Sequence, residues 1–201
     1  MPMIVSRDDV SMKPDIWLVR HGATEWSASG RHTGTTDVPL TADGRAAARA
    51  LAPRLAGHEF ALVLVSPASR ALETARLAGF ADAGVDADLV ERGYGDVEGR
   101  TTTEIRARGP EWRDWTVWSG AVPGGETLAE VGMRARRVLA RADRAPGDVL
   151  LFGHGHQLRI LTAVALDLDP GVGERFVLDP ATVSILGPEH ELRAVRAWNR
   201  D

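Results

Sequence analysis

The chain has 201 residues, 44% of them hydrophobic and 26% charged, which is typical of a globular protein with a substantial apolar core. A formal net charge of -4 gives no electrostatic reason to expect a nucleic acid or an anionic membrane as partner. Cysteine is absent and Lys13 is the single lysine, which excludes disulfides, thiolate nucleophiles, Schiff bases and lysine-based phosphate loops.

No apolar run reaches membrane-spanning length, and the N-terminal residues lack the apolar core of a signal peptide. We therefore expect a cytoplasmic protein with one domain, residues 1–201, in which residues 1–14 form a loose leader. A small molecule is the expected partner, and a homodimer is left open.

Apolar runs and helical periodicity predict an alternation of strands and helices along the chain. In chain order, the expected elements are a strand at 16–19, a helix at 42–55, a strand at 60–65, a helix from 66 to 79, an extended segment at 85–89, helices at 101–108 and 128–142, a strand at 149–152, a helix at 157–166, and strands at 181–186 and 192–198. Thr41 and Ser66 are the expected N-caps of the first two helices, and Pro53 is expected to kink or shorten the first. The alternation predicts an α/β fold, a three-layer α/β/α sandwich with a mostly parallel central sheet.

Three other features need a separate interpretation. The long polar loop at residues 27–39 is a candidate binding loop. A spacing of three fits one helical face, which indicates core packing, a lid or a pocket wall for Trp112, Trp115 and Trp118. A solvated face rather than a binding patch is expected for the arginines of the long helix and its end, Arg134, Arg137, Arg141 and Arg144.

Residue types that bind phosphate follow three of the predicted buried strands. These segments are Arg20-His21-Gly22, residues 66–70 and residues 153–156. Because the carboxyl ends of parallel strands meet at one edge of a sheet, we expect residues 20, 70 and 154 to converge. Two arginines, two histidines and a carboxylate are what phosphoryl transfer through a histidine requires. The cations neutralise the phosphoryl oxygens, one imidazole attacks, and an acid protonates the leaving oxygen.

These motifs resemble the histidine phosphatase superfamily, also called phosphoglycerate mutase-like. The resemblance runs from about residue 16 to residue 186 and is carried by Leu18-Val19-Arg20-His21-Gly22 with Thr24-Glu25-Trp26, Thr33-Gly34, Leu40-Thr41, Ser66-Pro67-Ala68-Ser69-Arg70-Ala71 with Glu73-Thr74-Ala75, Glu91 ahead of Gly95-Asp96-Val97-Glu98-Gly99, and His154-Gly155. The segments His154-Gly155-His156, Pro123-Gly124-Gly125-Glu126 and His32-Thr33-Gly34 are similar to the branch of acid phosphatases and sugar bisphosphatases.

The resemblance implies a catalytic role for five residues. His21 is the expected nucleophile, which becomes transiently phosphorylated. Arg20, Arg70 and His154 are expected to bind the phosphoryl group. Glu91 is the expected proton donor to the leaving group and then the base for water. The two arginines beside His21 are also expected to depress the pKa of its imidazole.

The resemblance further implies a set of substrate contacts. Thr33, Gly34 and the backbone at Gly155 are expected to touch the substrate. Arg92 and Tyr94 match residues that touch substrate in the mutase branch, although either could merely pack the loop. No cofactor and no metal ion are implied.

Several residues have a simpler alternative role. Glu91 could be a surface carboxylate paired with Arg92. His154 and His156 could bind a metal ion together with His21 or His32. The three remaining histidines are expected at the surface: His32, His58 and His190.

We therefore predict a phosphomonoesterase that acts through a phosphohistidine intermediate on a small phosphorylated metabolite. A cofactor-dependent phosphoglycerate mutase is the first alternative. Such mutases carry a long basic insertion that excludes water, whereas here Gly99-Arg100 leads directly to a short predicted helix, which favours hydrolysis. A non-catalytic phosphate-binding or regulatory module is the second alternative, but it would be expected to lose His21 or Glu91, and both are present.

Overall fold

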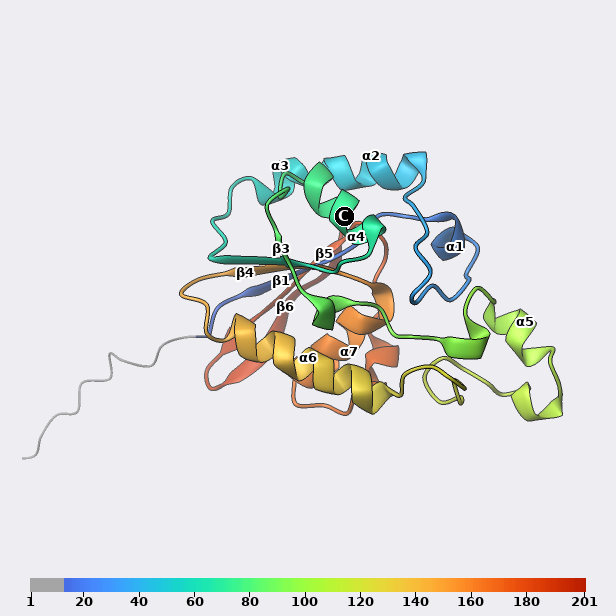
Figure 1. Cartoon of the computed structure of the whole chain (residues 1–201). Helices are drawn as coiled ribbons and strands as arrows, with labels where there is room; N and C mark the ends of the chain where they lie inside the picture. The colour runs from blue at the N-terminus through green and yellow to red at the C-terminus, as the bar shows by residue number, and fades with distance from the viewer. Residues whose placement is uncertain (1–12) are drawn as a thin grey trace, which may run out of the picture.

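A six-stranded sheet runs through the computed structural model, which describes residues 13–201 (Figure 1). Residues 1–12 of the expected leader lie outside the described residues. The strands are β1 (Ile16–Arg20), β2 (Leu62–Val65), β3 (Gly84–Val85), β4 (Val149–Gly153), β5 (Val183–Glu189) and β6 (Leu192–Arg200).

The strand order is β3-β2-β4-β1-β5-β6, and β1 to β4 run parallel to one another. β5 is antiparallel to β1, and β6 is antiparallel to β5. The prediction of a mostly parallel central sheet is therefore confirmed. Arg20 pairs with Gly153, and Val65 pairs with Phe152, so the carboxyl ends of β1, β4 and β2 lie side by side.

Helices cover both faces of the sheet (Figure 1). They are α1 (Glu25–Ala28), α2 (Ala42–Ala50), α3 (Ala52–Leu55), α4 (Ser69–Leu77), α5 (Thr102–Arg106), α6 (Leu128–Ala142) and α7 (Gly155–Ala165), with 3-10 helices at Ala87–Leu89, Gly95–Val97, Pro110–Trp112 and Pro170–Arg175. Trp17 and Val19 of β1 pack in a cluster with α3 and α4, whereas Ile16 and Leu18 pack in a second cluster with α6 and α7. The predicted three-layer α/β/α sandwich is confirmed.

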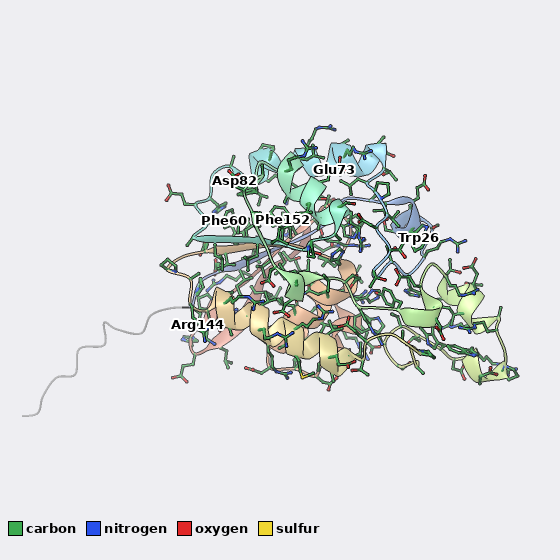
Figure 2. The ribbon with its side chains drawn as sticks, in the orientation of Figure 1. Trp26, Phe60, Glu73, Asp82, Arg144 and Phe152 are labelled. Atoms are coloured by element: carbon green, nitrogen blue, oxygen red, sulfur yellow. The ribbon has the colours of Figure 1, made fainter. Side chains whose placement is uncertain are left out.

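Aromatic rings fill part of the layer between the sheet and α2–α4. Phe60 lies 5.8 Å from Phe80, and Phe80 lies 5.8 Å from Phe152, measured between ring centroids. Figure 2 labels Phe60 and Phe152. Phe60 was expected within the second strand, but β2 begins at Leu62. Its ring packs against the edge of Trp17 instead, with centroids 5.5 Å apart.

A small third cluster lies beyond the carboxyl edge of the sheet, next to α5 (Figure 1). Its buried members are Tyr94, Val97, Ile105, Trp115 and Val117. The expectation that the three tryptophans share one helical face is wrong, because the segment consists of a single 3-10 turn and loops. The segment is instead held by packing: Trp115 is buried in this cluster, and Trp112 and Trp118 pack against it.

Two helix boundaries show how local chemistry competes with the sequence pattern. The expected helix at 42–55 is interrupted at Leu51 and resumes as α3 with Pro53 in its first turn, as predicted for this proline. The expectation that Ser66 caps the next helix is wrong. Ala68 occupies the N-cap position of α4, and the Ser66 side chain bonds to His154 instead.

The expectation of a solvated arginine face on α6 is wrong for Arg134, whose side chain is only 11% exposed, but is confirmed for Arg137, which is 55% exposed. Arg141 is half-buried. Arg134, Arg137 and Arg141 form ion pairs of 2.5–2.8 Å with carboxylates outside α6, namely Glu126, Asp88 and Asp86. Arg144 follows the end of α6 at the surface, as expected (Figure 2). The helix is therefore tied to the loop that follows β3.

Within residues 13–201, none of the helices combines the length and the hydrophobicity that a membrane span requires.

Two backbone segments approach each other closely just beyond β1. A Cβ atom on Gly44, in the first turn of α2, would clash with the carbonyl oxygen of Ala23. A Cβ atom on Gly22 would likewise clash with the carbonyl oxygen of Gly44. These two glycines let α2 pack directly on the loop that follows the end of the strand.

We predict that Gly44→Ala lowers the free energy of unfolding by about 1–3 kcal/mol, because the new methyl group forces α2 away from Ala23. Gly57→Ala is the matched control, because nothing lies within 4 Å of a Cβ atom there, and its change should stay within about 0.5 kcal/mol. Urea unfolding measures both variants. Equal stability of the two would contradict this account of the packing.

Candidate active site

The carboxyl ends of β1, β4 and β2 bring together residues that are far apart in the sequence. Arg20 ends β1, His21 follows it, and the His21 N–H donates to Gly153 O at the end of β4, at 3.0 Å. His154 follows the end of β4 as the N-cap residue of α7, and its ring centroid lies 5.1 Å from that of His21. Arg70 is contributed by α4, which follows β2. The predicted convergence of residues 20, 70 and 154 is confirmed.

His21 is held as a buried imidazole with one ring nitrogen committed. His21 is only 5% exposed, and its Nδ1–H donates to the carbonyl oxygen of Gly22 at 2.7 Å. Since Nδ1 carries the proton, the Nε2 lone pair is the nucleophilic site of the neutral ring. The Gly22 N–H donates to Thr74 Oγ1, and Thr74 Oγ1 donates to Arg70 O, which links this loop to α4.

Burial lowers the pKa of His21 well below its ordinary value, and the charges of Arg20 and Arg70 lower it further. The predicted direction is confirmed, but the larger cause is removal of the imidazole from water rather than the two arginines. Burial also lowers the pKa of His154, with further contributions from His21 and the same arginines. Both imidazoles are therefore held neutral.

Both arginines are anchored through their terminal nitrogens. Arg70 donates to the carbonyl oxygens of Thr36 and Gly34 at 3.1 Å, and Arg20 donates to the carbonyl oxygen of Leu178. Three buried nitrogens in this cluster have no partner among the described residues: Arg20 Nε, Arg70 Nε and His154 Nδ1. Buried donors without partners are costly, so this cluster is suited to receive an oxyanion.

Glu91 reaches the cluster from the loop that follows β3, and its carboxylate is bound by three backbone N–H groups. Oε1 accepts from Arg92 N at 2.9 Å and from Gln157 N at 2.8 Å, and Oε2 accepts from His156 N at 3.0 Å. Two of these donors belong to the first turn of α7, where the helix dipole favours a negative group. The alternative of a surface pair with Arg92 is wrong, because Glu91 is buried and contacts only the backbone of Arg92.

The loop that carries Glu91 is clamped from outside by an ion pair. Arg134 of α6 binds Glu126 in a bidentate pair at 2.8 and 2.9 Å, and also donates to the carbonyl oxygens of Asp88 and Val90. Glu126 Oε2 in turn accepts from Gly93 N at 2.9 Å. Backbone on both sides of the acid is thereby fixed to α6 and to the segment before it.

A cavity of about 170 Å³ opens above the cluster. Its walls contain most of the predicted substrate contacts, namely Thr33, Tyr94 and Gly155 together with Arg20, His21 and Glu91. The Arg20 guanidinium packs on Gly155, where a Cβ atom would approach Arg20 Cζ to 3.4 Å. Backbone at this position therefore stays close to the arginine.

Two predicted substrate contacts lie away from the cavity walls. The Arg92 side chain donates to the carbonyl oxygens of Glu126 and Val117, which fits the alternative that it packs the loop. Gly34 donates its N–H to Glu98 Oε1 at 3.2 Å and accepts from Arg70, so it supports the arginine rather than facing the cavity.

Sequence reasoning missed several residues that line the cavity, including Arg31, His32, His156 and Arg159. The expectation that His32 lies at the surface is wrong. The backbone N–H of His32 donates to Arg100 O at 3.0 Å. The imidazole points inward, with its ring centroid 5.2 Å from that of Tyr94. Burial lowers the pKa of His32 to about 4. The other two histidines expected at the surface, His58 and His190, are exposed.

His156 is held in the cavity wall by contacts with Tyr94 and Trp118. The Tyr94 hydroxyl lies 2.6 Å from His156 Nδ1, and the indole of Trp118 packs on the same ring at 5.0 Å. The Arg159 guanidinium lies over the Trp118 ring, with its Cζ 4.6 Å from the ring centroid. A histidine two residues after His154, on the first turn of the same helix, was the available signal.

Within residues 13–201, no three histidine, aspartate or glutamate side chains are arranged to hold a metal ion. The alternative in which His154 and His156 bind a metal with His21 or His32 therefore lacks a ligand set.

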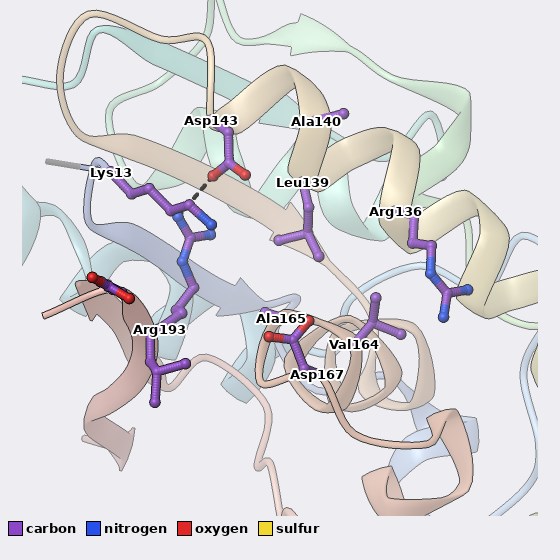
Figure 3. Close-up of a pocket in the computed structure, with 11 residues that line it drawn as sticks. Lys13, Arg136, Leu139, Ala140, Asp143, Val164, Ala165, Asp167 and Arg193 are labelled. Atoms are coloured by element: carbon purple, nitrogen blue, oxygen red, sulfur yellow. Dashed lines mark hydrogen bonds and ion pairs between the residues drawn. The ribbon is translucent and has the colours of Figure 1, made fainter. Parts of the chain in front are cut away.

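A second cavity, of about 300 Å³, lies at the opposite end of the strands beside the C-terminal turns of α6 and α7 (Figure 3). It is lined by an ion pair between Arg193 and Asp143, at 2.8 Å, and contains none of the predicted site residues.

We predict that the rings of His21 and His154 are still neutral as the pH falls through 6.5, the ordinary pKa of a histidine. Nitrogen NMR of the labelled protein measures this directly, with His21→Ala and His154→Ala samples to assign the signals. Because the unfolded chain binds more protons below pH 6.5, the free energy of unfolding should fall as the pH drops, by up to about 1.4 kcal/mol per pH unit for each such histidine. Protonation of His21 near pH 6.5 would contradict the prediction.

Comparison with known proteins agrees with the geometry. A model of the histidine phosphatase superfamily (branch 1) matches residues 16–201. An acid phosphatase of Mycobacterium tuberculosis is 41% identical over 88% of this chain and 87% of its own length. A sedoheptulose 1,7-bisphosphatase of Saccharomyces cerevisiae is 34% identical over 77% of this chain and 68% of its own length. Other relatives are named phosphoglycerate mutases.

The solved structure of the Mycobacterium tuberculosis open reading frame Rv3214 has the same fold, with a TM-score of 0.86 and 38% identity. The likeness covers 93% of this chain and 97% of that one. The match extends over β1, β4 and the elements that hold the candidate site. This chain therefore belongs to the histidine phosphatase superfamily.

Proposed function

We propose that the protein hydrolyses small phosphate monoesters through a phosphohistidine formed at His21. The observation that carries this proposal is the neutral, buried imidazole of His21, with its Nδ1 proton committed to Gly22, beside two anchored guanidiniums. A neutral imidazole next to fixed cations is what an attack on phosphorus requires.

In the first step, Arg20, Arg70 and His154 bind the phosphoryl oxygens, and His21 Nε2 attacks phosphorus in line with the leaving oxygen. The N–P bond forms as the ester P–O bond breaks, and the bond electrons pass to the leaving oxygen. Glu91 gives that oxygen its proton, and the product alcohol departs.

In the second step, water attacks the phosphohistidine. Glu91, now a carboxylate, takes one proton from the water as its oxygen bonds to phosphorus and the N–P bond breaks. The electrons of that bond return to His21 Nε2, which restores the neutral imidazole. Inorganic phosphate is released, and Glu91 regains the proton needed for the next turnover.

The cavity favours a small substrate with additional negative charge or hydroxyl groups. Its volume of about 170 Å³ suits a metabolite rather than a polymer, and Arg159 adds a cation to its lining. One relative is named a sedoheptulose 1,7-bisphosphatase, which is a sugar bisphosphatase. We propose phosphorylated sugars and sugar acids as the substrate class.

The proposal includes finer statements about the setting of the enzyme. It works without a metal ion, supported by the lack of a ligand set within residues 13–201. It acts in the cytoplasm and without a nucleic-acid or membrane partner, supported by the net charge of -4 and the composition. A homodimer stays a prediction.

Two other functions remain to be separated from hydrolysis by experiment. A mutase would return the phosphoryl group to a second sugar acid, and the named mutase relatives keep this alternative open. A binding module would retain ligand but not turn it over. The presence of both His21 and Glu91 in one cavity favours an enzyme.

We expect His21→Ala to lower kcat/KM by about 10⁴-fold or more, because no other nucleophile replaces the imidazole. A panel of phosphorylated sugars and acids is assayed for released phosphate and for isomerised product, with and without EDTA. Hydrolysis that is unaffected by EDTA and lost in the variant supports the proposal. Isomerised product without free phosphate would assign a mutase, and loss of activity with EDTA would contradict metal-free catalysis.

Glu91→Gln should slow alkyl phosphates by about 10²–10³-fold and 4-nitrophenyl phosphate far less, because only the poor leaving group needs its proton in the first step. The ratio of kcat/KM for the two substrates, in the wild type and the variant, measures this. The amide keeps the shape of the side chain and one acceptor oxygen, which can retain the bonds from Arg92 N and Gln157 N, while the bond from His156 N is lost. An equal loss for both substrates would remove Glu91 from the role of acid.

A further inference from the structure

Ser66 is a buried residue that the mechanism above does not use. It follows β2 directly, is 0% exposed, and donates its N–H to Phe152 O of β4 at 3.0 Å. Its hydroxyl oxygen lies 2.7 Å from His154 Nε2 and also accepts the N–H of Ala68 at 3.4 Å. The side chain therefore stands between the end of β2 and the imidazole of His154.

Two proton arrangements are compatible with the contact between Ser66 and His154. In one, the hydroxyl donates to Nε2, which leaves the ring proton on Nδ1. In the other, Nε2–H donates to the hydroxyl oxygen, which already accepts from Ala68. The hydroxyl proton would then have no acceptor among the described residues, and the Nδ1 lone pair would have no donor there.

The first arrangement leaves fewer buried groups unpaired. Only the Nδ1–H then lacks a partner, whereas the second arrangement leaves both the hydroxyl proton and a ring lone pair unbonded. The Nδ1–H also becomes a donor beside Arg20 and Arg70, where the proposed function places phosphoryl oxygens. Hydrogen bonds to such an anion are stronger than those between neutral groups.

We propose that Ser66 is a positioning residue that donates its hydroxyl proton to His154 Nε2 and so keeps the ring proton on Nδ1, pointed at the phosphoryl site. The catalytic part of this claim rests on the proposed function. The tautomer of the free protein does not depend on it. Without the hydroxyl, Nε2 loses its donor and the ring is free to exchange tautomers, so a lone pair rather than N–H can meet the anion.

Nitrogen NMR of histidine-labelled protein tests the tautomer, because long-range proton couplings distinguish a protonated from an unprotonated ring nitrogen. In the wild type, we expect the proton of His154 on Nδ1. In Ser66→Ala, we expect the Nε2-protonated form to appear, and in Ser66→Thr the original tautomer should return, because the hydroxyl is kept. Ser184→Ala is the matched control, since Ser184 is equally buried and its hydroxyl contacts Asn199 N of β6.

Binding of inorganic phosphate supplies the functional measurement. Ser66→Ala should weaken it about ten- to a hundredfold, the range expected when one hydrogen bond to a charged group is lost, while Ser66→Thr and Ser184→Ala bind nearly as the wild type does. A wild-type His154 protonated on Nε2, or an unchanged tautomer in Ser66→Ala, would overturn the proposal, and the wild-type spectrum decides even if a variant does not fold. A wild type with the expected tautomer but no phosphatase activity would overturn the proposed function and leave the tautomer assignment standing.

Discussion

The site depends on one constraint: the His21 imidazole is buried away from water, beside the fixed guanidiniums of Arg20 and Arg70. An imidazole in water would be partly protonated near neutral pH, and a protonated ring has no lone pair for phosphorus. Burial is the larger cause of its lowered pKa, and Arg20 and Arg70 add to it. The hydrogen bonds that hold the two guanidiniums go to backbone carbonyl oxygens, and Arg70 also lies 3.9 Å from the exposed carboxylate of Asp37. Their positive charge thus remains available to an anion, and the chain as a whole can stay acidic.

Parallel strands make this arrangement possible because their carboxyl ends lie at a common edge. β1, β4 and β2 are neighbours in the sheet, so three segments separated by dozens of residues end together. Short polar links then fix their relative positions: Thr74 joins the loop after β1 to α4, and Ser66 joins β2 to His154. Glu91 arrives from a loop without regular structure, and it is located instead by the N-terminal turn of α7 and by the clamp that Arg134 forms with Glu126. Glu91 is therefore positioned by the same helix that follows His154.

The sequence predicts those parts of the molecule that depend on local pattern. Long apolar runs predicted β1 and β4 because a strand buried on both faces needs apolar residues at every position. The same runs predicted which polar residues meet, since strand ends in a parallel sheet converge. The tryptophan segment and His32 could not be predicted in this way, because tertiary contacts with Tyr94 and Arg100 decide where they lie. Ser66 shows the same limit: its serine-proline sequence is typical of a helix start, but a nearby imidazole captures the hydroxyl and the helix begins three residues later.

The central claim is that phosphorus bonds to His21, and rapid quenching during turnover tests it most directly. The enzyme is mixed with excess 4-nitrophenyl phosphate, stopped in alkali within milliseconds, digested, and analysed by mass spectrometry for phosphorylated peptides. The account predicts a phosphoryl group on the peptide that contains His21, stable in base and lost on brief exposure to acid. Active enzyme that never carries this adduct, or that carries it on His154, would contradict the account.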